Sequence, residues 1–219
     1  MTYVPSQESY RIGTPLDLAK KLGEKGITKL LEMVCAAYAI LYRNRIVKPK
    51  MDECDITEEL YKEVNFAWSK SDITETVIPT NEKIDRENAE RRGRPPTIDF
   101  CFRARWERHA FFGFECKVLA EGDSRSYREY INEGLYRYIE GKYCANGSAG
   151  SLIGYINSGR IAVIVKDIKT RVNRQRIVEF MTLASSISGF REHYISTHLR
   201  KDSSPFCVHH LFFSFVELN

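Results

Sequence analysis

The spacing of apolar residues predicts two helices in the first third of the chain. Apolar side chains recur at helical spacing over residues 16–46, which predicts one helix or two. If there are two, the break is expected at Gly23 and Gly26. The later piece has a wide apolar face and is expected to be buried against the rest of the protein. A further helix is predicted over residues 52–68, where apolar side chains recur every four positions.

The rest of the chain is expected to form a mixed sheet flanked by helices. The polar segment 69–96 contains three prolines and predicts a loop, with room for a short helix, that leads into the first strand. After this segment, stretches in which apolar residues recur every two positions alternate with stretches in which they recur every three to four positions. The predicted elements are strands 97–106 and 109–119, helix 126–142, a buried segment or small helix over 149–156, strand 160–168, helix 172–187, and strands 192–199 and 208–217.

Composition and charge describe an ordinary globular protein with a mildly basic surface. The chain has 219 residues, of which 43% are hydrophobic and 28% charged, enough for one good-sized domain with an added helical piece. The net charge of +4 is compatible with nucleic-acid binding. Residues 33–42 are too short to span a bilayer, and the N-terminus lacks the pattern of a signal peptide. We therefore expect a cytoplasmic protein that does not enter a membrane.

Two motif classes are missing from the sequence. The six cysteines are scattered and form no C-x-x-C pair, which argues against a zinc site and fits a reducing compartment. No P-loop or dinucleotide fingerprint is present, so no nucleotide cofactor is expected. His193 and His198 have no evident partner carboxylate and are interpreted as surface or sheet residues. His209 and His210 are adjacent and must face opposite sides of a strand, so they cannot both serve one site.

The most informative feature is a pair of opposite charges inside an apolar strand. Glu115 and Lys117 are two positions apart, so their side chains point to the same side of the strand. Charges in such a strand are costly unless they are paired or bind something. A simple ion pair on a half-exposed strand is the alternative, but both flanking faces are apolar. Asp99 lies one strand earlier and supplies a second carboxylate.

This combination predicts a site for a divalent cation beside a phosphate. Mg²⁺ prefers oxygen ligands and keeps several waters, so Asp99, Glu115 and the backbone carbonyl of Cys116 make a sufficient ligand set. Lys117 would orient the attacking water, lower its pKa, or stabilise charge at the scissile phosphate.

Ile98-Asp99 followed by Phe114-Glu115-Cys116-Lys117, with an acidic helix before and a helix after, resembles the PD-(D/E)XK nuclease superfamily. The position before Asp99 carries Ile98 where many members have proline. The resemblance implies an α/β, restriction-endonuclease-like fold, in which an N-terminal helical segment of residues 1–50 packs on a nuclease-like domain of residues 51–219. It also implies a further site carboxylate on the preceding helix. Glu53 is the first candidate and Glu59 the second, although acidic residues in a first helical turn are expected from the helix dipole alone.

The resemblance implies an Mg²⁺-dependent endonuclease acting on DNA, with Mn²⁺ as a possible substitute, in prokaryotic restriction or anti-phage defence. Asp99, Glu115, Lys117 and Glu53 are the expected catalytic residues, and Asp99, Glu115, Cys116 and Glu53 the expected metal ligands. The candidate phosphate-contacting residues are the loop residues Arg91, Arg92 and Arg94 together with Arg137 and Lys142, for which a solvated surface is the alternative.

Cleavage of both DNA strands requires two active sites, so a homodimer or a subunit of a defence complex is expected. The N-terminal helix and the last two strands are the expected interface. Three alternatives stay open: a subunit that cuts only with a partner, a nuclease acting on RNA, and a binding subunit without activity.

Overall fold

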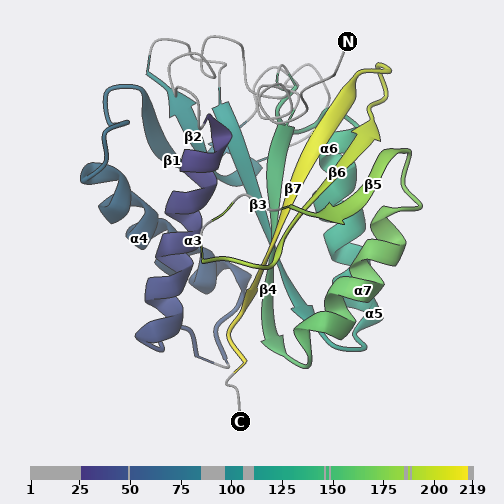
Figure 1. Cartoon of the computed structure of the whole chain (residues 1–219), viewed down its shortest axis with the longest axis horizontal. Coiled ribbons are helices and arrows are strands. Elements are labelled where there is room, and N and C mark those ends of the chain that lie inside the picture. The colour runs from purple at the N-terminus through teal and green to yellow at the C-terminus, as the bar shows by residue number, and fades with distance from the viewer. Residues whose placement is uncertain are drawn as a thin grey trace.

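The computed structural model describes residues 26–48, 50–84, 97–105, 111–145, 147, 149–184, 187 and 189–216, with the side chains of residues 82–84 excluded. It has a seven-stranded mixed sheet that runs between two layers of helices (Figure 1), so the expected mixed sheet flanked by helices is confirmed. The elements in chain order are α3 (Ile27–Arg43), α4 (Glu53–Ser69), β1 (Val77–Ile84), β2 (Thr97–Ala104), β3 (Phe111–Ala120), α5 (Ser124–Glu129), the π-helical segment η2 (Tyr130–Leu135), α6 (Tyr136–Ile139), β4 (Ala149–Ser158), α7 (Ile161–Val172), β5 (Ile177–Leu183), β6 (His193–Leu199) and β7 (Pro205–Ser214).

The sheet has parallel strands at its centre and antiparallel strands at both edges. The strand order is β1-β2-β3-β4-β7-β6-β5. Strands β3, β4 and β7 run parallel to one another, whereas β1-β2-β3 and β5-β6-β7 are antiparallel. Helices cover both faces of the central strands, which explains why β3, β4 and β7 read as nearly continuous apolar segments.

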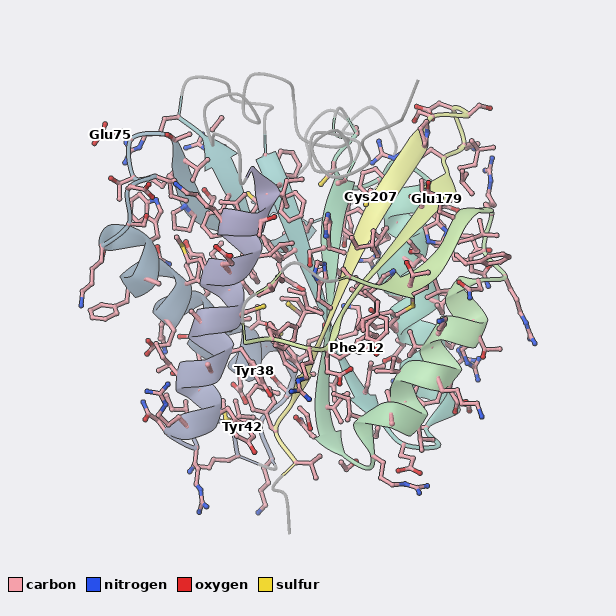
Figure 2. The ribbon with its side chains drawn as sticks, viewed as in Figure 1. Tyr38, Tyr42, Glu75, Glu179, Cys207 and Phe212 are labelled. Atoms are coloured by element: carbon pink, nitrogen blue, oxygen red, sulfur yellow. The ribbon has the colours of Figure 1, made fainter. Side chains whose placement is uncertain are left out.

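Two core layers hold the helices to the sheet. One lies beneath α3 and α4, where the Tyr38 ring stacks on Phe213 with 4.3 Å between ring centroids. The other lies beneath α5, η2, α6 and α7, where Tyr130 stacks on Phe212. Tyr38 and Phe212 mark the two layers in Figure 2. Each central strand therefore contributes side chains to both layers.

The first helical segment and the last strand face the protein's own core. The apolar stripe of α3 is fully buried together with side chains of the sheet, and so is most of β7. The apolar side chains of these two elements are therefore covered within the chain, and the subunit interface expected there stays a prediction. The earlier part of the predicted helical range, residues 16–25, lies outside the described residues.

The predicted strand 160–168 and helix 172–187 are both wrong. Residues 161–172 form α7, in which Ile164, Ile168 and Val172 recur every four positions and face the core. Residues 177–183 form β5, an edge strand whose pairing with β6 shifts register twice. These shifts break the two-residue alternation, and Val178, Phe180 and Leu183 stay exposed, so the apolar residues imitate helical spacing.

Two further strands, β1 and β4, were not predicted. Residues 77–84 form β1 at the other edge of the sheet, inside the segment expected to be a loop. Its Pro79 fits an edge strand, because proline lacks a backbone donor. Residues 149–158 form the central strand β4, where Gly150 and Gly154 let the chain pack closely against Tyr138 and Phe212. The buried segment expected here is therefore a strand and not a small helix.

No helix within the described residues has both the length and the apolar character needed to cross a membrane.

Candidate active site

The candidate site lies where β2 separates from β3. The pairing of these strands ends at Phe100 and Phe114, whereas β3 continues beside β4 as far as Ala120. Beyond that point the N–H of Cys116 donates to Asp99 Oδ2 at 2.7 Å, and the N–H of Val118 donates to Glu53 Oε2 at 3.2 Å. Carboxylates thus take the place of the neighbouring strand. We call this site the notch, and it consists of Glu53, Asp99, Glu115, the Cys116 carbonyl and Lys117.

The Lys117 ammonium lies at the centre of the notch. Its Nζ lies 2.8 Å from Glu53 Oε1 and 2.9 Å from Glu115 Oε1, and it donates to the Cys116 carbonyl at 2.6 Å. The expected facing of Glu115 and Lys117 is confirmed. Burial by itself would lower the pKa of Lys117, but the carboxylates of Glu115, Glu53 and Asp99 outweigh it and raise the pKa. The ammonium therefore stays charged at neutral pH.

Glu115 is a buried carboxylate with one free oxygen. The residue is only 2% exposed, and its Oε2 has no hydrogen-bond partner among the described residues. Burial, followed by repulsion from Asp99, raises the pKa of Glu115 to about 8. Burial also raises the pKa of Asp99, against the opposing effects of Lys117 and the Cys116 N–H. Both carboxyl groups are thus harder to ionise than usual in the metal-free protein. A bound cation would compensate their negative charges, so the site is suited to one.

The start of α4 brings the third carboxylate into the notch. Asp52 caps this helix in a reciprocal capping box with Asp55, which fixes the first turn and the direction of Glu53. Both Glu53 oxygens accept hydrogen bonds, from Lys117 Nζ and from the Val118 N–H. Glu59, the second candidate, lies two turns further along and pairs with Lys62 on the surface. Of the two candidates, only Glu53 reaches the site.

Two of the expected phosphate-contacting residues, Arg137 and Lys142, lie in the described part of the chain, and Arg137 is the one that meets the notch. Its Nη1 lies 3.6 Å from Glu115 Oε1. Lys142 forms an ion pair with Glu140. The loop residues Arg91, Arg92 and Arg94 lie outside the described residues. Tyr143 was not singled out from the sequence, yet its hydroxyl contacts Arg137 and donates to the Thr97 carbonyl at 3.0 Å.

The notch fits a hard cation only if water completes the coordination. Within the part of the chain that is described, no three or more His, Cys, Asp and Glu side chains converge as a ready-made metal cluster. Two carboxylates and a carbonyl are nevertheless a normal protein contribution to an Mg²⁺ site, which keeps several waters. The unpartnered Oε2 of Glu115 is a suitable ligand atom. Cys116 contributes only its backbone, because its thiol points into the core layer beneath α3 and α4, where it contacts Tyr155.

The four histidines in the described part of the chain are buried, whereas the sequence predicted surface or sheet positions for His193 and His198. Among the described residues, His193, His198, His209 and His210 are at most 1% exposed. His209 and His210 face opposite sides of β7, as expected: His209 pairs with His193 at 3.0 Å, and His210 lies between Tyr130 and Ser196 at 2.9 and 2.8 Å. Desolvation lowers the pKa of each, so they are neutral parts of the core and stay away from the notch.

A pocket of about 300 Å³ lies elsewhere, at the turn between β6 and β7, and shares no residue with the notch. Arg200 lines it but directs its guanidinium to backbone carbonyls, including those of Tyr143 and Cys144 at 3.0 and 2.8 Å. The pocket therefore offers no comparable set of reactive groups.

Comparison with known proteins gives the chain no relative: no family model, no curated protein and no solved structure matches it. The notch is therefore the feature of this chain that bears on its function.

Proposed function

We propose that the protein is an Mg²⁺-dependent endonuclease that hydrolyses DNA phosphodiester bonds. The observation that carries the proposal is the notch, where Asp99, Glu115 and Lys117 meet in a largely buried setting that leaves one carboxylate oxygen unpartnered. Buried ionisable groups with perturbed pKa values, gathered at a break in a sheet, are typical of a functional site.

Each residue has a distinct role in this proposal. Mg²⁺, when bound, would neutralise phosphate charge and acidify a water molecule. Asp99, Glu115 and the Cys116 carbonyl would hold it, which requires Lys117 to give up its contacts with Glu115 and with the Cys116 carbonyl. Lys117 would then donate hydrogen bonds to the attacking water or to the scissile phosphate, where negative charge develops.

We propose that Glu53 binds the Lys117 ammonium and is not a metal ligand. Both of its oxygens accept hydrogen bonds from protein donors, one from Lys117 Nζ and one from the Val118 N–H. Glu53 would hold the ammonium in place once Glu115 turns to the metal. It would act as a positioning residue, because it reaches the reacting atoms only through Lys117.

The charge of the notch makes substrate binding depend on the metal. The notch holds the carboxyl groups of Glu53, Asp99 and Glu115 beside the cations of Lys117 and Arg137. Once Glu115 is ionised, as it must be to hold a metal, a phosphate meets net negative charge there unless a divalent cation is bound, so we expect DNA to engage the notch only with Mg²⁺ present.

The finer features belong to the same proposal. A restriction-endonuclease-like fold is supported by the mixed sheet and by the position of the notch on two adjacent strands. The role in restriction or defence, and the assembly as a homodimer or with a partner, rest on the sequence resemblance.

The deciding experiment is cleavage of supercoiled plasmid and linear DNA with Mg²⁺ or Mn²⁺, comparing the wild type with Lys117→Ala. Metal-dependent cutting by the wild type that is lost in the variant would support the proposal. If the folded wild type binds no Mg²⁺ in calorimetry and cuts nothing, the proposal fails. The same assay with RNA tests the alternative substrate, since Mg²⁺ binding with cleavage of RNA alone would reassign it.

A further inference from the structure

We infer that Arg137 is the phosphate-binding residue of the notch and contacts a non-bridging oxygen of the phosphodiester being cleaved. The inference rests on the proposed function and deepens it, because it says which group of the protein grips the substrate beside the metal.

Arg137 approaches the notch from the side opposite α4. Its Nη1 lies 3.6 Å from Glu115 Oε1, longer than a normal hydrogen bond, whereas Lys117 Nζ lies 2.9 Å from the same oxygen. Arg137 therefore lies beside the carboxylate without donating a hydrogen bond to it. About a third of its side chain is exposed, compared with 2% for Glu115. The guanidinium is thus the more accessible of the two to an incoming phosphate.

The side chain is held at a fixed place. Nη2 lies 2.5 Å from Glu133 Oε2, and Nη1 donates to the hydroxyl of Tyr143. Tyr143 is itself buried and donates to the Thr97 carbonyl at the start of β2, two residues before Asp99. These contacts take only part of a guanidinium with five N–H donors in a rigid fork, the geometry that suits phosphate oxygens.

The helix that carries Arg137 is distorted directly before it. The π-helical segment η2 ends at Leu135, two residues before Arg137. Such segments insert an extra residue and turn all later side chains relative to the earlier ones. As a result Tyr130 faces His210 in the core, whereas Arg137 faces Glu115. Gly134 fixes the approach of this helix to the sheet, because a Cβ there would lie 2.7 Å from Leu152 Cδ1.

A purely structural role for Arg137 makes a different prediction. If Arg137 only holds Glu115, its loss should weaken Mg²⁺ binding. If it binds phosphate, its loss removes a repelling cation from beside a metal ligand, so Mg²⁺ should bind at least as tightly as before. DNA binding should instead weaken, and it should depend less steeply on salt because one phosphate contact is gone.

The test compares Arg137→Gln with Arg125→Gln. Arg125 lies on the same helical stretch and pairs with Glu129 as Arg137 pairs with Glu133, but it faces solvent. Each substitution is made in the wild type and in a Lys117→Met background that cannot cleave. Calorimetry measures Mg²⁺ affinity, and fluorescence anisotropy with a short DNA duplex in Mg²⁺ measures affinity over a salt series.

We expect Arg137→Gln to lower DNA affinity roughly tenfold near 0.1 M salt and to reduce the salt slope by about one, with Mg²⁺ affinity kept. Arg137→Lys should recover the slope because it restores the charge, and Arg125→Gln should change nothing. An unchanged slope overturns the inference, whether or not Mg²⁺ binding weakens. If the Lys117→Met background does not fold, cleavage kinetics of the single variant Arg137→Gln replace the binding measurement. A raised KM supports the inference, and an unchanged KM and kcat overturn it. Loss of the proposed function itself is recognised separately, by a wild type that neither binds Mg²⁺ nor cuts.

Discussion

Lys117 Nζ lies 2.8 Å from Glu53 Oε1, although 64 positions separate the two residues in the chain. The first turn of α4 is directed at the point where β3 leaves β2, so a helix from one part of the chain completes a site built on two strands from another. This contact links the stability of the metal-free protein to the groups of the proposed reaction.

At pH 9, where Glu115 is ionised in the wild type, removing the Lys117 ammonium should destabilise the metal-free protein by about 3–5 kcal/mol, because the buried Glu115 loses its partner. Urea unfolding of Lys117→Met in a chelator measures this loss. Mg²⁺ at about a hundred times its dissociation constant should restore about 2.7 kcal/mol. The control is Lys29→Met, which breaks the surface pair with Asp72 and should cost at most about 1 kcal/mol. An equal loss in both variants would contradict the buried arrangement.

Replacing Glu53 by Gln should slow cleavage about 10–100-fold while Mg²⁺ affinity stays at the wild-type value, since Glu53 acts on Lys117. Single-turnover rates at saturating DNA, together with calorimetry, separate the two quantities. Glu59→Gln on the same helix is the matched control and should behave as the wild type. If Glu53→Gln instead weakens Mg²⁺ binding as strongly as Asp99→Asn, Glu53 is a metal ligand.

Glu115→Gln should abolish Mg²⁺ binding and raise the metal-free stability above pH 7. The folded protein holds the pKa of Glu115 at about 8, above the unfolded value of 4.5, so folding loses stability as the pH rises through this window. A neutral amide removes that loss. Thermal unfolding between pH 5 and 9 in a chelator measures the effect: the wild type should lose more stability than the variant over this range. Parallel pH profiles would refute the prediction.

The buried histidines should make the protein sensitive to acid. Desolvation lowers the pKa of His193 to about 4, whereas the unfolded value is about 6.5. Between these pH values His193 is protonated in the unfolded chain but stays neutral in the folded protein, so stability falls as the pH drops below 6.5. His193→Gln should reduce the stability lost between pH 7 and pH 5 by about 2 kcal/mol. The readout is this difference between two pH values, which is insensitive to a constant packing cost of the substitution.

Several parts of the fold followed directly from local patterns. Ile56, Leu60 and Val64 predict α4 because one helix face carries them all, and the segments around Phe100 and Phe114 predict β2 and β3 because they are apolar and β-branched or aromatic. The facing of Glu115 and Lys117 needed only the two-residue period of a strand. Where the local period is ambiguous, as over Ile161–Val165, the sequence interpretation chose a strand, and the structure has a helix.

The sequence by itself determined the chemistry that is available in the notch: an acid, then an acid and a lysine two positions apart, on consecutive strands. Only the tertiary structure decided which helical carboxylate joins them, since Glu53 and Glu59 both suit a helix start but the angle at which α4 meets β3 lets Glu53 alone reach Lys117. It also decided that Arg137 and Tyr143 border the notch, because the π-helical turn resets the helix register after Leu135. Contacts between distant segments depend on packing geometry, which a local pattern does not contain.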